Sequence, residues 1–274
     1  MIARFNREKA SLDDDRPPGL VVLDIGNSSL HVGLWSDRGV ADVRRLEHGD
    51  RTGLAESLTE MRSNSARAGL VAAVVACVVP DALSAAEESI TQALELQALV
   101  IGRDLPLPMA VAVHRPETVG VDRMCAAAAA YEKVRDTCTV IDFGTAVTVD
   151  LVDEAGVFQG GAILPGLWMQ AHALGNHTAV LPVVSTEFPD QPVGKDTTEA
   201  IRSGICHGLV GAVRNLVEEY ATRLNRWPYV VATGGDAAMM VAHCDFIDKM
   251  VPDLCLCGVG LAYVKYLNAE SEET

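Results

Sequence analysis

The sequence predicts an α/β protein that is built from two related lobes. A unit of strand, tight turn and returning strand occurs twice, at residues 20–35 and 139–153, about half a chain apart. Stretches with strand and helix patterns alternate along the rest of the chain, which is typical of α/β lobes. A chain of 274 residues, 49% of them hydrophobic, is long enough to bury two such cores.

The repeated unit carries the same residue types in both copies. An apolar strand ends in an aspartate, Asp24 or Asp142, and a glycine, Gly26 or Gly144, follows after one residue. A carboxylate at a fixed strand end can serve a hydrated cation, and glycine lets backbone N–H groups approach a ligand closely. Side-chain donors that suit phosphate oxygens are Asn27, Ser28, Ser29 and Thr145. A simple turn explains either copy alone, but two copies favour a nucleotide held between two lobes.

Charge and cysteine content exclude several kinds of partner. The chain has 37 acidic and 22 basic residues, a net charge of −15, which argues against nucleic-acid and anionic-membrane surfaces. Residues 1–18 lack the apolar segment of a signal peptide or anchor, and we expect a disordered leader there. Seven scattered cysteines fit reduced thiols rather than disulfides, so we expect a cytoplasmic protein.

The remaining elements follow from hydrophobic period and turn residues. Further strands are expected at 39–46, 69–79, 99–102, 157–163 and 229–233. Helices are expected at 52–64, 81–97, 122–135, 166–176, 198–224 (with Gly208 as a candidate break), 237–243 and 260–267, followed by an acidic tail, 269–274. Cys255 and Cys257 fall on an apparent strand, which makes a zinc ribbon improbable. The proline-rich stretch 181–194 is a candidate lid or interface segment.

Asp122 and Arg123 lie where an alanine-rich helix begins. One interpretation is an N-cap aspartate followed by a solvated arginine. The other is a carboxylate that acts as a base beside an arginine that binds an anionic substrate. The helix dipole disfavours positive charge in the first turn, so the position of Arg123 favours the second interpretation.

Four glycine motifs are candidates for phosphate binding. Residues 160–166, GGAILPG, predict a close approach of backbone, and the Gly234-Gly235 turn suits either a nucleotide or a plain strand-to-helix turn. Residues 194–197 lack the earlier glycine of a P-loop, and Gly258-x-Gly260 lacks the third glycine of a dinucleotide fingerprint.

With these residues laid out, residues 20–267 resemble the type III pantothenate kinases of the actin-like ATPase superfamily. Six blocks occur in the family's order: DIGNSS at Asp24, PETVGVDR ending at Arg123, IDFGTAVTVD around Asp142, GGAILPGL at Gly160, TTEAIRSG ending at Gly204 and TGGDA at Thr233. The resemblance implies two actin-like (ribonuclease H-like) lobes, each a mixed sheet flanked by helices, with the nucleotide in the cleft between them. We expect these lobes at 19–125 and 126–268.

The resemblance also implies an activity and its site. The activity is ATP-dependent phosphorylation of pantothenate to 4′-phosphopantothenate, the first step of coenzyme A biosynthesis, by a homodimer. The implied ATP-binding residues are Asp24, Ile25, Gly26, Asn27, Ser28, Ser29, Leu30, His31 and Thr145. The implied substrate-binding residues are Gly120, Val121, Asp122, Arg123 and Thr197, with Asp122 as the catalytic base and Thr198 as an alternative to Thr197. Asp24 would bind Mg²⁺ through water, and Asp142 would bind K⁺ or NH₄⁺.

Two alternatives to this activity remain open. One is an actin-like kinase for another small hydroxy acid, and the other is a non-catalytic ATP-binding regulatory protein. The presence of Asp24, Asp122 and Asp142 favours the kinase. For the homodimer, the helix from Gly120 and residues 179–196 are the expected interface.

Overall fold

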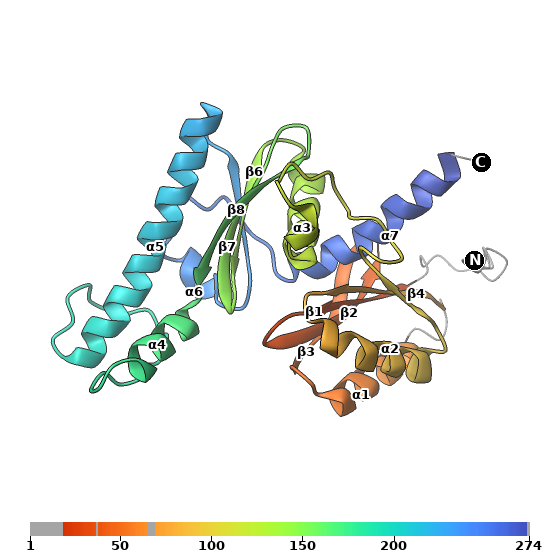
Figure 1. Cartoon of the computed structure of the whole chain (residues 1–274), viewed down its shortest axis with the longest axis horizontal. Helices are drawn as coiled ribbons and strands as arrows, with labels where there is room; N and C mark the ends of the chain where they lie inside the picture. Colours follow the sequence, from red (N-terminus) through yellow and green to blue (C-terminus); the bar gives the residue numbers. More distant parts are fainter. Residues whose placement is uncertain (1–18, 37, 65–68, 273–274) are drawn as a thin grey trace. The chain divides into compact units, whose positions relative to one another are not determined.

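The computed structural model describes residues 19–36, 38–64 and 69–272 (Figure 1). Contacts within the chain form two compact units. Unit 1 comprises Met1–Pro108, Gly120–Cys125 and Cys255–Thr274, and unit 2 comprises Met109–Val119 and Ala126–Leu254. The two lobes predicted from the sequence, 19–125 and 126–268, are continuous ranges of residues, whereas the two units are not. The division into these lobes remains a prediction. The predicted leader, 1–18, lies outside the described residues.

Unit 1 contains a five-stranded mixed sheet in the order β3-β2-β1-β4-β5. Its strands are β1 Gly19–Ile25, β2 Ser29–Ser36, β3 Gly39–Glu47, β4 Leu70–Cys77 and β5 Ala98–Val100. β1, β2 and β3 pair antiparallel, whereas β4 and β5 run parallel to β1. Helices α1 (Arg51–Asn64) and α2 (Pro80–Leu94) bury Leu58, Met61 and Ile90 against this sheet. The sheet and its two helices thus enclose one apolar core.

Unit 2 repeats this arrangement. Its sheet has the order β10-β9-β6-β7-β8, which places the two antiparallel strands and the two parallel strands around β6 as around β1. The strands are β6 Cys138–Phe143, β7 Ala146–Val152, β8 Phe158–Pro165, β9 Tyr229–Thr233 and β10 Lys249–Met250. The helices are α4 Leu167–Asn176, α5 Thr197–Leu224 and α6 Ala237–Val241. The predicted duplication is confirmed, and it extends from the hairpin to the whole sheet.

Helix α3 (Val121–Val134) begins at the predicted place, whereas helix α7 (Leu254–Glu272) differs from the prediction. The expected strand around Cys255 and Cys257 is wrong, because both residues lie in the first turn of α7. Nearly every side chain from Leu254 to Tyr263 is apolar or glycine, so the sequence shows no helical period there. The long helix α5 runs unbroken through Gly208. Among the described residues, no helix is long and apolar enough to cross a membrane.

Candidate active site

The first predicted phosphate loop is a tight hairpin in unit 1. The main-chain N–H of Gly26 donates to the carbonyl oxygen of Ser29 at 3.0 Å, which closes the turn between β1 and β2. Asp24 lies opposite His31 in the antiparallel register, and the Nε2 atom of His31 lies 3.3 Å from the hydroxyl of Ser29. The hairpin therefore presents a carboxylate, a hydroxyl and an imidazole at one end of β1 and β2.

Asp122 lies inside the first turn of α3 rather than at its N-cap. Its Oδ1 atom accepts a hydrogen bond from the N–H of Arg123 at 2.8 Å. A Cβ atom on Gly120 would lie 2.4 Å from the same oxygen, so the carboxylate leans over a residue without a side chain. Burial raises the pKa of Asp122, and the main chain and charge of Arg123 oppose this rise. A raised pKa is expected for a carboxylate that acts as a base near neutral pH. It is not expected for a helix N-cap, whose charged form is stabilised by the N–H groups that it accepts from.

Asp24 and Asp122 both face Cys255, at the start of α7. The pKa of the Cys255 thiol is raised well above its ordinary value by a hydrogen bond to Cys125, by burial and by the charges of Asp24 and Asp122. Burial also raises the pKa of Cys77, with a smaller contribution from the charge of Asp24. Unit 1 therefore gathers the aspartate of the phosphate loop and the predicted base around one thiol.

The second predicted loop lies in unit 2, where Asp142 ends β6. Asp142 pairs with Thr233 of the parallel strand β9, so both residues lie at the carboxyl ends of their strands. Gly234 follows with a φ of +103°, and a Cβ atom there would lie 2.4 Å from Asp142 Oδ1 and 2.5 Å from the carbonyl oxygen of Phe143. Because Gly234 has no side chain, its main chain can approach both oxygen atoms closely.

Thr145 and Thr197 are held by other elements of unit 2. The N–H of Gly166 donates to the carbonyl oxygen of Thr145 at 3.0 Å, and a Cβ atom on Gly166 would overlap this oxygen. The close backbone approach predicted for GGAILPG is thus present. Thr197 is the first residue of α5, exposed, and follows the N-cap Asp196, whose side chain accepts from the N–H of Glu199 at 2.8 Å.

Residues 181–194 lie against α5. The guanidinium of Arg202 donates to the hydroxyl of Ser185 at 2.9 Å. The ring of Phe188 stacks on His243, with centroids 3.4 Å apart, and meets the edge of His207. These contacts could not be predicted from local sequence patterns, because they join residues that are distant along the chain.

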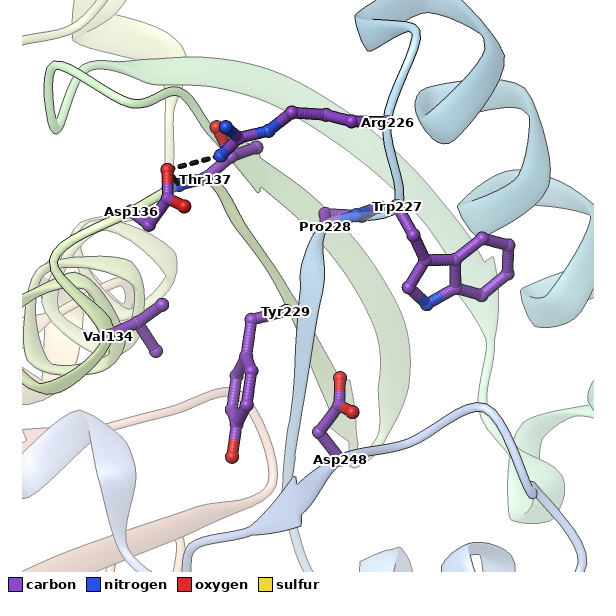
Figure 2. A pocket seen from close by; sticks show the side chains of 8 residues that line it. All are labelled: Val134, Asp136, Thr137, Arg226, Trp227, Pro228, Tyr229 and Asp248. Carbon is purple, nitrogen blue, oxygen red and sulfur yellow. Dashed lines mark hydrogen bonds and ion pairs between the residues drawn. The ribbon is translucent and has the colours of Figure 1, made fainter.

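Unit 2 contains a cavity, which Figure 2 shows from close by. It lies away from Asp142 and Thr233. It has a volume of about 520 Å³ and is lined by Val134, Asp136, Thr137, Arg226, Trp227, Pro228, Tyr229 and Asp248. Arg226 forms an ion pair with Asp136 across it. Thr137 precedes β6 and Tyr229 begins β9, whereas Asp142 and Thr233 lie at the other ends of these strands. This cavity is therefore separate from the second predicted loop.

The predicted metal ligands, Asp24 and Asp142, do not belong to a cluster of metal-binding side chains in the described part of the chain. Within residues 19–36, 38–64 and 69–272, no group of three or more His, Cys, Asp or Glu side chains could hold a metal ion. Hard cations also take main-chain carbonyls, phosphates and water as ligands. Asp24 and Asp142 can therefore each contribute one carboxylate to a cation whose other ligands come from these sources.

Solved structures identify the class of fold. A protein from Campylobacter jejuni described as a Baf family transcriptional activator is 17% identical, covers 92% of this chain and 99% of its own, and has a TM-score of 0.55. The activator of 2-hydroxyisocaproyl-CoA dehydratase from Clostridium difficile, solved with bound ADPNP, is 15% identical, covers 93% and 97%, and has a TM-score of 0.53. With its two mixed five-stranded sheets flanked by helices, the chain has the actin-like ATPase fold.

Sequence comparisons give the family within this class. The family model described as "Type III pantothenate kinase" matches residues 20–219. Curated relatives with that description include proteins from Listeria innocua, 31% identical over 89% of this chain and 96% of the relative, and Dehalococcoides mccartyi, 32% identical over 89% and 96%. The chain belongs to the type III pantothenate kinase family. It is a kinase with ATP and pantothenate as substrates, and its nucleotide is used with a divalent metal ion.

Proposed function

We propose that Asp122 is the general base for phosphoryl transfer from Mg²⁺-ATP to the hydroxyl group of pantothenate. Asp122 accepts the hydroxyl proton as the oxygen bonds to the γ-phosphorus and ADP leaves. Arg123 binds the carboxylate of pantothenate, with Gly120, Val121 and Thr197 as further substrate contacts. The observation that carries the proposal is the partly buried carboxylate of Asp122, whose pKa is raised, in the same unit as the loop at Asp24.

Asp24 and the turn that follows it bind the phosphates of ATP in this proposal. Phosphoryl transfer depends mainly on positioning and on neutralising charge, which Mg²⁺ supplies when it is bound with ATP. The net charge of −15 repels the anionic nucleotide, so hydrogen-bond donors close to the phosphates must attract it. The donors come from the main chain and side chains of residues 24–31 and from Thr145. Asp24 orients the metal ion through a water molecule.

Asp142 binds a monovalent cation, K⁺ or NH₄⁺, in this proposal. The donor chemistry fits, because Asp142 Oδ1 and the carbonyl oxygen of Phe143 are two oxygen atoms that both lie next to Gly234. Neutral and singly charged oxygen donors suit a large monovalent cation. The cation balances the charge of Asp142 near the bound phosphates.

A homodimer completes the proposal, with residues 179–196 in its interface. β8, α4 and this segment carry exposed apolar side chains: Ile163, Trp168, Met169, Val180, Val183 and Val193. Val180 is 86% exposed and Ile163 is 63% exposed. Burial of such side chains favours association with another protein surface. The alanines of α3 contribute less, because Ala126 to Ala130 are already buried within the chain.

The location we propose is the cytoplasm. All seven cysteines are free thiols in the structure, which fits a reducing compartment.

The experiment that tests this function uses the purified protein with Mg²⁺-ATP and a panel of hydroxy acids. We expect pantothenate to gain one phosphoryl group, as detected by mass, far faster than pantoate, glycerate or water. Phosphorylation of another acid in preference to pantothenate would support the alternative kinase. ATP binding without transfer to any acceptor would support the regulatory alternative.

A further inference from the structure

Helix α7 approaches the main chain of α3 closely at Gly258. A Cβ atom on Gly258 would lie 1.9 Å from the carbonyl oxygen of Cys125 and 2.7 Å from its Cα atom. Nonbonded carbon atoms do not approach so closely, so any side chain at this position must push the two helices apart. Both residues belong to unit 1, and both are buried. The crossing of α3 and α7 therefore depends on the absence of a side chain at Gly258.

The same face of α7 reaches the predicted base. Cys255 lies one helical turn before Gly258, and residues three apart share a face of a helix. Its thiol hydrogen-bonds to that of Cys125, and it lies close enough to Asp24 and Asp122 to feel both charges. Cys125, in turn, follows Asp122 by three residues on α3. The first turns of α7 and α3 are thus packed together beside the two carboxylates.

We propose that Gly258 and Cys255 are positioning residues for the kinase reaction, because they fix the first turn of α3 and with it the carboxylate of Asp122. This inference rests on the proposed role of Asp122 as the base. A base must be within hydrogen-bond reach of the proton that it accepts, and a displacement of about 1 Å can lower the rate by about 100-fold. Gly258 itself contacts neither substrate.

Gly260 provides a matched control on the same helix. A Cβ atom there would lie 2.3 Å from the indole ring of Trp35, on β2, rather than against α3. Gly258→Ala and Gly260→Ala therefore both crowd α7, but only the first crowds the turn that carries Asp122. A purely structural role of α7 predicts similar effects of the two substitutions.

The test compares kcat, the KM values and thermal stability of the wild type, Gly258→Ala and Gly260→Ala. For Gly258→Ala we expect kcat to fall by about 10- to 100-fold, while the KM for ATP changes by less than about threefold. For Gly260→Ala we expect a similar loss of thermal stability, with kcat within about threefold of the wild type. Equal losses of kcat in the two variants, or an unchanged kcat in Gly258→Ala, would overturn the proposal.

A second variant and a second readout keep this test separate from that of the proposed function. If Gly258→Ala does not fold, Cys255→Ala takes its place, since it removes a contact without adding atoms, and an unchanged kcat overturns the proposal. If the wild type does not phosphorylate pantothenate, the proposed function fails.

In that case the positioning of Asp122 is tested by the ¹³C signal of its carboxyl group, which is assigned by comparison with Asp122→Asn. A shift in Gly258→Ala but not in Gly260→Ala supports positioning, and its absence contradicts it.

Discussion

Gly234 packs its main chain against the carboxylate of Asp142, with the Cβ position of the glycine 2.4 Å from Oδ1. Asp142 lies on β6 and Gly234 directly follows the neighbouring parallel strand β9, so the two residues are 92 positions apart in the sequence. The conformation of Gly234, with a φ of +103°, is one that other residues rarely adopt. This contact ties the predicted cation ligand to the TGGDA motif.

Gly234→Ala should therefore remove activation by K⁺ and lower stability. The methyl group would overlap Asp142 Oδ1 and displace the carboxylate, and the backbone strain costs about 1–3 kcal/mol. We expect a turnover rate that no longer differs between potassium and sodium buffers. Gly235→Ala is the control, because its Cβ atom would meet nothing within 4 Å. Normal potassium activation in Gly234→Ala would contradict the proposed cation site.

The two threonines at the start of α5 can be separated by substitution. If Thr197 binds the substrate, Thr197→Ala should raise the KM for pantothenate about tenfold, which corresponds to the loss of about one hydrogen bond. Thr198→Ala should leave this KM nearly unchanged. The reverse result would assign the role to Thr198. Steady-state kinetics at saturating ATP measure both variants.

The N-cap of α5 should contribute to stability. Asp196→Ala removes the acceptor for the N–H of Glu199 and should lower the free energy of unfolding by about 1 kcal/mol. Asp196→Asn keeps an acceptor oxygen and should lose much less. Denaturant titrations of the two variants give the comparison, and equal losses would show that the charge rather than the hydrogen bond matters.

Val180→Asp should weaken the proposed homodimer. A carboxylate in place of the exposed side chain of Val180 would have to be desolvated when two copies associate through this segment. We expect the wild type to sediment as a dimer at micromolar concentration and the variant to shift toward the monomer. Glu187→Gln, on the same segment, serves as a control that removes a charge. A wild-type protein that is monomeric under these conditions would contradict the proposed interface.

The stability of Asp122→Asn relative to the wild type should depend on pH. Because burial raises the pKa of Asp122 in the folded protein, the stabilising effect of its protonated form is complete below the unfolded pKa, about 4. This effect is lost as pH rises through the folded pKa. Above that pH, the variant avoids the cost of a buried charge and should be the more stable protein. Urea titrations between pH 4 and about 8 measure the difference, and the exposed Asp81→Asn is the control.

The two hairpins were predictable because their pattern is local. An apolar strand, an aspartate, a glycine one residue later and a second strand occur within about 15 residues at Asp24 and again at Asp142. The alanine content that begins α3 is equally local. Such patterns place the candidate residues on their elements without any knowledge of tertiary contacts.

The role of α7 could not be predicted in this way. Gly258 and Gly260 suggested an incomplete nucleotide motif, yet each makes room for a partner that is far away in the sequence, Cys125 and Trp35. Nor does a uniformly apolar segment show a helical or strand period, so Cys255 was assigned to a strand. Tertiary packing also decides the units of two segments that are separated from their sequence neighbours. Residues 255–274 belong to unit 1, and residues 109–119 belong to unit 2.

The most direct test of the account compares phosphoryl transfer from Mg²⁺-ATP to pantothenate in the wild type and in Asp122→Asn, with ATP binding measured on the same samples. We expect the wild type to form 4′-phosphopantothenate and the variant to be about 100- to 10,000-fold slower, with ATP affinity unchanged. The amide has nearly the same shape as the carboxylate but cannot accept the proton. A variant that turns over at nearly the wild-type rate would contradict the assignment of Asp122 as the base.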